Sequence, residues 1–190
     1  MKTGLFFGSF NPVHMGHLVI ANYMANYTQL DEVWMVVSPH NPLKNKKGLS
    51  NSYDRLEMVR IATENSLHLK VSDIEFNLPK PSYTIDTLSY LEEKYPQKEF
   101  ALIMGADNLA SFKKWKNYEV MLKNYKIFVY PRPGAVIEEW KNHPSIIITE
   151  APQMDLSSTF IRKAVQEKKN IQFFVPDPVI DFIEGKSMYR

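Results

Sequence analysis

Two of the five histidines in this chain stand three positions apart, in the stretch "GSFNPVHMGHL" at residues 8–18. His14 and His17 could ligate a metal ion, cap or pack against a helix, or donate hydrogen bonds to phosphate oxygens. A zinc site needs three or four ligands. The chain has no cysteine, and its other three histidines are scattered. Metal ligation is therefore the weakest of the three interpretations.

The neighbours of the histidines favour phosphate. Gly8, Ser9 and Gly16 are small enough to let a ligand approach the backbone, and Pro12 stiffens the turn. A helix that begins after His14 would direct free N–H groups and its dipole at an anion. Neither a G-x-x-x-x-G-K-[S/T] loop nor a G-x-G-x-x-G fingerprint occurs in the chain. This turn is therefore its strongest phosphate-site candidate.

A second candidate of the same kind lies in "DLSSTFIRKA" at residues 155–164. Ser157, Ser158 and Thr159 precede a helical pattern, and Arg162 follows about one turn later. These hydroxyl residues could simply cap the helix, but with the arginine they could also clamp a phosphate group. Two such stretches, far apart in the chain, suggest a polyphosphate held between two helix N-termini.

The elements that must position these motifs follow from the hydrophobic pattern. Short apolar runs predict strands at 4–8, 32–37, 69–74, 100–105, 126–130 and 145–149. The runs are mostly continuous, as in strands covered on both faces, and helical patterns lie between them. We therefore expect an α/β fold, a single-domain Rossmann-like open parallel sheet with helices on both faces. Ligands of such sheets bind beyond the carboxyl ends of the strands, where the strand order reverses.

Composition restricts the class of protein further. The chain of 190 residues has a formal net charge of only +2, which does not suggest a protein that coats nucleic acid. No apolar run approaches the roughly 20 residues of a membrane span, and no signal peptide is recognisable. We expect one domain over residues 1–190, in the cytoplasm, with no membrane partner.

Both motifs have counterparts in a known superfamily. "GSFNPVHMGH" resembles the G-x-F-x-P-x-H-x-G-H signature of nucleotidyltransferases, and "SSTFIR" resembles their second signature. The stretches "PSYTIDTL" (81–88), "MGADNLASFKKW" (104–115), "YPRPG" (130–134) and "MYR" (188–190) resemble nicotinate-nucleotide adenylyltransferases. Phosphopantetheine adenylyltransferases share the first signature, but they are shorter and lack most of these stretches. They are the closest alternative.

The resemblance implies an activity. The family transfers the adenylyl group of ATP to nicotinate mononucleotide, giving deamido-NAD and pyrophosphate. It uses Mg²⁺, which phosphates and water would hold, with no ligand directly from the protein. The implied partners are ATP and nicotinate mononucleotide rather than nucleic acid, and a homo-oligomer is left open.

The resemblance also assigns residues. His14, His17, Lys44 and Arg162 would act on the ATP phosphates, with His17 nearest the α-phosphate. Lys44 stands in "NPLK", where the family often has P-P-H-K. Further contacts to ATP would come from Gly8, Ser9, Phe10, Asp107, Ser157, Ser158 and Thr159.

The nicotinate mononucleotide would be held by Tyr83, Thr84, Trp115 and Arg132. Tyr83 and Thr84 would offer backbone donors to the nicotinate carboxylate, and Trp115 would stack on the pyridine ring. Plainer interpretations stay open: Trp115 as a core residue, Asp107 as a helix cap and Arg132 as an exposed loop residue. For the whole chain, the alternatives are a different adenylyltransferase, a non-catalytic nucleotide sensor and a nucleic-acid-binding module that uses the basic stretch 43–48.

Overall fold

Six strands form one sheet in the computed structural model, which describes residues 1–39, 48–79 and 81–190. The strands are β1 (Lys2–Gly8), β2 (Glu32–Val37), β3 (Leu69–Ser72), β4 (Glu99–Gly105), β5 (Lys126–Tyr130) and β6 (Ile146–Ile148). Each corresponds to one predicted apolar run. β3 is shorter than its run because the Ser72 hydroxyl accepts a hydrogen bond from the Ile74 N–H at 3.4 Å, and a 3₁₀ helix begins there.

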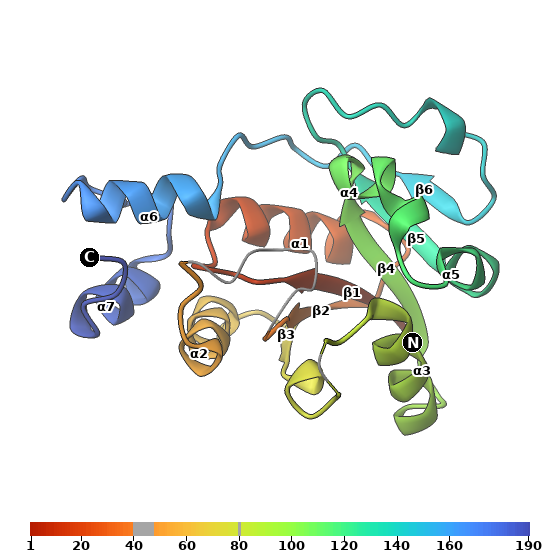
Figure 1. The fold of residues 1–190 in the computed structure, drawn as a ribbon, viewed down its shortest axis with the longest axis horizontal. Coiled ribbons are helices and arrows are strands. Elements are labelled where there is room, and N and C mark those ends of the chain that lie inside the picture. Colours follow the sequence, from red (N-terminus) through yellow and green to blue (C-terminus); the bar gives the residue numbers. More distant parts are fainter. Residues whose placement is uncertain (40–47, 80) are drawn as a thin grey trace.

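All neighbouring strands are parallel, and their order is β3-β2-β1-β4-β5-β6 (Figure 1). The chain first builds outward from β1 to β3 and then crosses back to place β4 on the other side of β1. The strand order therefore reverses between β1 and β4, and a ligand crevice is expected at their carboxyl ends. The predicted α/β class with an open parallel sheet is confirmed.

Helices cover both faces of this sheet. They are α1 (Met15–Tyr27), α2 (Ser52–Thr63), α3 (Thr84–Lys94), α4 (Ala106–Ala110), α5 (Tyr118–Asn124), α6 (Ser158–Gln166) and α7 (Asp177–Gly185). Three 3₁₀ helices join them: η1 (Ile74–Phe76), η2 (Phe112–Lys114) and η3 (Glu138–Trp140). None of the helices in the described ranges has the length and apolar character that crossing a bilayer would require.

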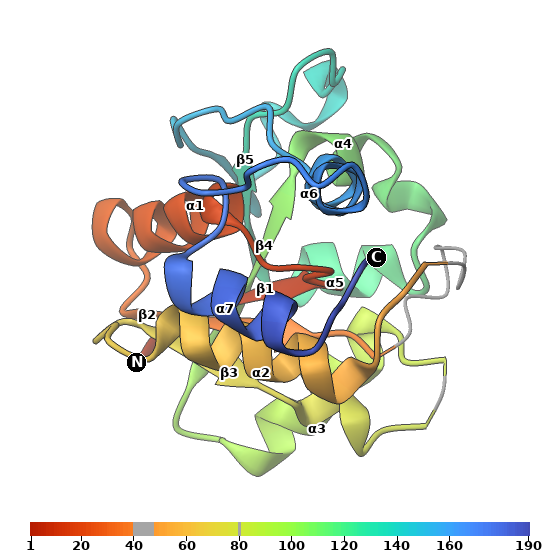
Figure 2. The same ribbon diagram turned by 90° about the vertical axis from the view of Figure 1, so that its left-hand side faces the viewer.

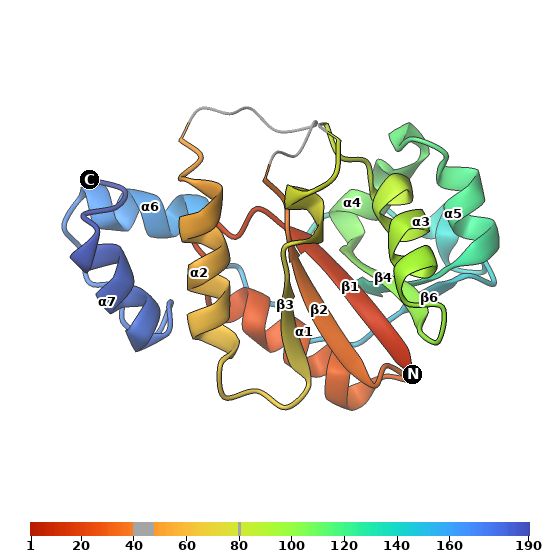
Figure 3. The ribbon, with the colours of Figure 1, turned by 90° about the horizontal axis from the view of Figure 1, so that it is seen from below.

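Two hydrophobic cores lie on the two faces. Successive strand residues point to opposite faces, so Phe6 belongs to one core and Leu5 to the other. Phe6 packs with residues of α1, α2, α6 and α7, whereas Leu5 packs with residues of η1, α3, α4 and α5. Figure 3 shows α2 beside β3 and α3 beside β4. The helices thus enclose the sheet and leave its carboxyl edge to the loops.

The last two helices return to the start of the chain. α7 lies alongside α2 (Figure 2), and Lys186 pairs with Asp54 at the start of α2. Beyond α7, the Tyr189 hydroxyl donates to Asn11 Oδ1 at 2.9 Å. The turn after β1 is therefore covered by residues from the other end of the sequence.

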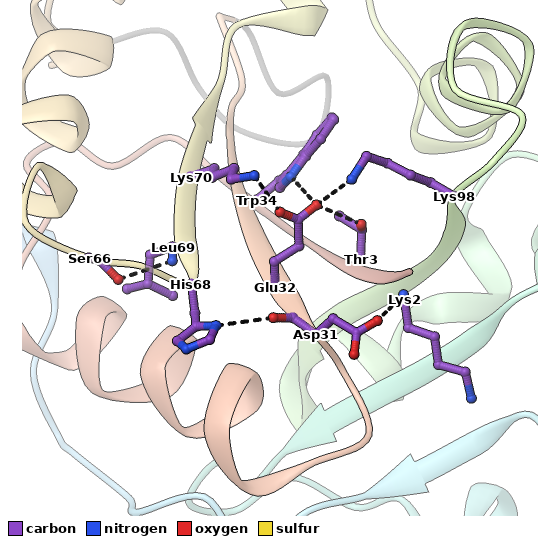
Figure 4. A network of polar contacts seen from close by, with 10 residues as sticks. All are labelled: Lys2, Thr3, Asp31, Glu32, Trp34, Ser66, His68, Leu69, Lys70 and Lys98. Carbon is purple, nitrogen blue, oxygen red and sulfur yellow. Dashed lines mark hydrogen bonds and ion pairs between the residues drawn. The ribbon is translucent and has the colours of Figure 1, made fainter.

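The opposite edge of the sheet carries an ionic network around a buried carboxylate (Figure 4). The Glu32 carboxylate pairs with Lys70 at 2.7 Å and with Lys98 at 2.6 Å. It also accepts hydrogen bonds from Thr3 Oγ1 and Trp34 Nε1, both at 2.9 Å. Burial alone would raise the pKa of Glu32, but the hydrogen bonds from the two lysines and the threonine outweigh it and lower the pKa to about 2. This network holds the amino ends of three strands together.

Candidate active site

A cavity of about 490 Å³ opens at the carboxyl edge, among the ends of β1, β4 and β5 and the start of α6. That volume suits a nucleotide-sized ligand. Residues from both sequence motifs line it. The predicted site residues on its wall are Gly8, Ser9, Phe10, His14, His17, Asp107, Arg132, Ser157, Ser158, Thr159 and Arg162. The cavity thus lies where the strand order reverses, and residues predicted from both motifs line it.

Direct contacts hold the two motifs together. Ser158 Oγ donates to the Pro12 carbonyl at 2.9 Å, and Arg162 Nη1 donates to the Asn11 carbonyl at 2.8 Å. Arg162 Nη2 also reaches Thr159 Oγ1 at 3.3 Å. The start of α6 is therefore fixed against the turn between β1 and α1, and both helix N-termini border the same space.

Capping also occurs at α6, as the plainer interpretation predicted. Ser157 is the N-cap residue, and its hydroxyl accepts a hydrogen bond from the Phe160 N–H at 3.2 Å. One cap satisfies one of the four free N–H groups of a helix start. Because Ser157, Ser158 and Thr159 all line the cavity, the cap and an anion site are compatible at this N-terminus.

The two imidazoles form a stacked pair, with ring centroids 3.7 Å apart and an interplanar angle of 26°. His14 is 3% exposed; its burial first, and the charge of Arg132 second, lower its pKa to about 4. His14 is therefore neutral at neutral pH. Its backbone N–H donates to His17 Nδ1 at 3.3 Å, so a neutral His17 carries its proton on Nε2.

Phe10 supports the histidine pair from inside the protein. Its ring is buried and meets the His17 ring edge-on at 5.0 Å. Its backbone has φ of 46°, a region that costs a residue with a Cβ some free energy. A Cβ on Gly8 would lie 2.7 Å from the same ring, so a glycine is needed there. The Phe10 side chain thus positions His17 more than it offers a ligand surface.

Asp107 and Arg132 are neighbours on the cavity wall. Asp107 Oδ1 lies 3.9 Å from Arg132 Nε, and the Arg132 guanidinium stacks over the Tyr130 ring at 5.3 Å. The N-cap of α4 is Gly105, so Asp107 does not act as its cap. Arg132 is only partly exposed and is therefore not a free loop residue. It lines the same cavity as the residues predicted for ATP.

Three residues predicted for nicotinate mononucleotide do not line this cavity: Tyr83, Thr84 and Trp115. They nevertheless belong to two neighbouring segments. Lys116 Nζ lies 4.7 Å from the centre of the Tyr83 ring and binds the Asp86 carboxylate at 2.9 Å. Thr84 begins α3, so free backbone N–H groups of a helix start are available there. The geometry thus separates these three residues from the motif cavity.

Trp115 lies at the edge of the second core. Its ring meets Phe112 edge-on at 5.4 Å, and its buried Nε1 has no hydrogen-bond partner among the described residues. Core packing is therefore part of its role, and stacking on a ligand stays a prediction. Lys44 falls at 40–47, outside the residues that the structure describes, so its role also stays a prediction.

Comparisons with known proteins identify the family. The cytidylyltransferase-like family model matches residues 5–164. A Flavobacterium johnsoniae protein with the name "Probable nicotinate-nucleotide adenylyltransferase" is 53% identical over 192 residues, covering 100% of both chains. This chain belongs to the nicotinate-nucleotide adenylyltransferase family. The Cytophaga hutchinsonii relative of the same name is 49% identical and covers 100% of this chain and 98% of its own.

A solved structure shares the fold. It is the Plasmodium falciparum nicotinic acid mononucleotide adenylyltransferase complexed with NaAD, with a TM-score of 0.82. The alignment covers 99% of this chain and 97% of that one at 20% identity, so it supports the fold alone. Family membership, which comes from the closer relatives, decides against the phosphopantetheine adenylyltransferase alternative.

Arg55 is a site residue that sequence reasoning missed. It is fully buried, and its Nη1 donates to the carbonyls of Ser9 at 2.6 Å and Ser38 at 2.9 Å. Its Nη2 and Nε donate to Pro39 and Ser50 at 3.0 and 3.1 Å. Burial lowers its pKa to about 10, so the guanidinium stays charged at neutral pH. It ties the turn after β1 to the end of β2 and the start of α2.

Two signals in the sequence could have pointed to this network. Arg55 stands one turn before Val59, on the face of α2 that becomes buried. Asn11 follows the small residues of the first motif, and its side chain accepts from the Tyr189 hydroxyl at 2.9 Å and donates to the Gly48 carbonyl at 2.8 Å. Tyr189 belongs to the "MYR" stretch. Burial raises the pKa of its hydroxyl to about 12, which keeps it a donor.

Proposed function

We propose that this protein transfers the adenylyl group of ATP to nicotinate mononucleotide, giving deamido-NAD and pyrophosphate in NAD biosynthesis, through one adenylyltransferase domain spanning residues 1–190. The observation that carries the proposal is the shared cavity, in which the histidine turn and the start of α6 are joined through Ser158 and Arg162. Family membership supplies the reaction class. The same proposal places the protein in the cytoplasm, whereas its oligomeric state and the lack of a nucleic-acid partner stay predictions.

The reaction is a direct in-line displacement. A phosphate oxygen of the mononucleotide attacks the α-phosphorus of ATP, the bond to the bridging oxygen breaks, and pyrophosphate leaves with the electron pair. The nucleophile is already an anion, so no general base is required. The protein must instead hold two anions together and stabilise the charge that grows on the leaving group. Positioning alone can contribute ~7–11 kcal/mol.

The residues of the cavity fit these tasks. Neutral His14 can donate a hydrogen bond toward the α-phosphate without being consumed as an acid, and His17 on the same cavity wall can donate a second one. The N-terminus of α6 and Arg162 can hold the β- and γ-phosphates. The Arg132 guanidinium adds positive charge on the opposite wall. Preorganised donors of this kind explain how transfer proceeds without a covalent enzyme intermediate.

Magnesium would enter with ATP. Among the described residues no group of three or more metal-ligating side chains gathers. The family resemblance implies that phosphate oxygens and water would hold the ion, and this stays part of the proposal. The Asp107 carboxylate lies on the cavity wall beside Arg132. It can accept a hydrogen bond from metal-bound water or from ribose. When bound, the ion neutralises phosphate charge.

A pyrophosphate-release assay tests the proposal. The purified protein is incubated with ATP and Mg²⁺ and with one acceptor at a time: nicotinate mononucleotide, nicotinamide mononucleotide or phosphopantetheine. We expect the fastest release with nicotinate mononucleotide, because backbone donors at the start of α3 suit a carboxylate. Release with phosphopantetheine alone would overturn the substrate assignment, and no release with any acceptor would favour the nucleotide sensor.

A further inference from the structure

Two glutamates are buried at opposite edges of the sheet, in contrasting surroundings. Glu32 pairs with two lysines (Figure 4). Glu75, in η1, is only 3% exposed and forms no ion pair with any described residue. Burying a carboxyl group without a cation costs free energy unless hydrogen bonds compensate. The position of Glu75 near the carboxyl edge therefore calls for a reason other than charge pairing.

Three hydroxyl groups surround the Glu75 carboxyl. Thr87 Oγ1 donates to Glu75 Oε1 at 3.1 Å, and the hydroxyls of Ser38 and Ser82 also hydrogen-bond to this carboxyl. All three partners are buried. They come from the end of β2, from the segment that precedes α3 and from the first turn of α3. Burial raises the pKa of Glu75, and these hydrogen bonds partly offset the effect.

This hydroxyl cluster encloses the start of α3. Ser82 directly precedes Tyr83 and Thr84, and Thr87 lies one turn after Tyr83. Thr87 Oγ1 also lies 3.4 Å from the Tyr83 carbonyl, so its hydroxyl touches both the helix start and the glutamate. One carboxyl group thus holds both ends of the turn that contains the predicted backbone donors to nicotinate.

We infer that Glu75 is a positioning residue for the acceptor nucleotide, because its carboxyl fixes the backbone N–H groups of Tyr83 and Thr84 through Ser82 and Thr87. The inference rests on the proposed function, since it assigns the start of α3 to nicotinate mononucleotide. Glu75 does not line the cavity assigned to the triphosphate. A loss of the carboxyl should therefore weaken the use of the acceptor much more than the use of ATP.

The test compares Glu75→Ala, Glu75→Gln and Thr87→Val with the matched control Glu32→Gln, which alters the other buried glutamate. For each protein the KM for nicotinate mononucleotide, the KM for ATP, kcat and the thermal midpoint are measured. The wild type is assayed first. If it does not use nicotinate mononucleotide, the proposed function fails. If it does, the inference on Glu75 is judged from the difference in KM between each variant and the wild type.

We expect Glu75→Ala to raise the KM for nicotinate mononucleotide roughly tenfold or more and the KM for ATP less than about twofold, because misplaced donors lose much of their effect. Glu75→Gln should show a smaller rise, since its amide oxygen still accepts one hydroxyl. Thr87→Val should change the same KM in the same direction. Glu32→Gln should lower the thermal midpoint and leave both KM values unchanged.

An equal rise of both KM values, or an unchanged KM for nicotinate mononucleotide in folded Glu75 variants, would overturn the inference. If Glu75→Ala does not fold, Glu75→Gln and Thr87→Val decide the question by the same comparison. Unchanged acceptor KM values in both of them would then overturn it.

Discussion

In the proposed mechanism, burial prepares His14 to donate a hydrogen bond to phosphate. Because burial keeps the pKa of His14 near 4, its imidazole does not compete for a proton at neutral pH and can serve as a fixed donor. The bond from the His14 N–H to His17 Nδ1 selects the tautomer of the second ring. Both imidazoles are therefore held in place by protein contacts, and the proposed mechanism needs no proton transfer during turnover.

Loss of His17 should affect turnover far more than stability. We expect His17→Ala to lower kcat by about 10²–10³-fold, the usual effect of removing one donor to a developing charge. Circular dichroism and the thermal midpoint should stay close to the wild type. The control is His68→Ala, an exposed histidine at the other edge of the sheet, which should keep full kcat. Near-normal adenylyl transfer by His17→Ala would refute its assignment.

At the scale of elements, the cavity depends on how segment ends are tied together. α6 is held on the turn after β1 through Ser158 and Arg162. α2 contributes Arg55, whose guanidinium binds carbonyls of three separate segments. Buried carbonyl groups need hydrogen-bond donors. The Arg55 guanidinium supplies these donors to loop carbonyls. The loops at the carboxyl edge are thereby fixed without regular structure.

Replacement of Arg55 tests this role. We expect Arg55→Met to lower the free energy of unfolding by at least about 3 kcal/mol, because four carbonyls lose a charged donor. It should also reduce kcat, since Ser9 lies in the turn proposed to bind phosphate. Urea denaturation provides the measurement. Arg60→Met, on the exposed face of the same helix and paired with Glu57 at 3.6 Å, should change stability by less than about 0.5 kcal/mol. Equal effects of both changes would contradict the role of Arg55.

At the scale of the whole molecule, the two edges of the sheet have different tasks. The amino edge is fastened by the Glu32 network, in which each charge has a partner. The carboxyl edge instead gathers two arginines, two aspartates and helix starts around a cavity. The end of the chain also returns to this edge through Tyr189. The Glu32 network therefore lies away from the cavity, so its contribution to stability can be tested without altering the cavity wall.

The Glu32 network predicts an acid-sensitive component of stability. Its pKa is about 2 in the fold and 4.5 as the ordinary value, so its contribution is complete above pH 4.5 and is lost as the pH falls toward 2. We expect Glu32→Gln to cost on the order of 2–3 kcal/mol at pH 7 and to flatten the decline below pH 4.5. Unfolding measured between pH 2 and 7 checks this. Glu57→Gln, an exposed carboxylate, should keep the wild-type profile.

The sequence alone determined the α/β class, the strands and the two motifs that are proposed to bind phosphate. Continuous apolar runs and helical periodicity are local properties, and the motifs depend on residue types within ten positions. The carboxyl edge also followed, because the first motif directly follows the first predicted strand, whereas the strand order and its reversal came from the structure.

Only the tertiary structure decided which distant groups meet. In the sequence, Arg55 shows only that it shares a helix face with Val59, and Glu75 shows only that an acidic residue precedes a turn. Their burial depends on carbonyls and hydroxyls supplied by other segments. Arg132 similarly lines the same cavity as the residues proposed to bind the triphosphate, because β5 ends beside β4. Such contacts arise from packing between segments far apart, and a pattern within one segment holds no record of the partner that will cover it.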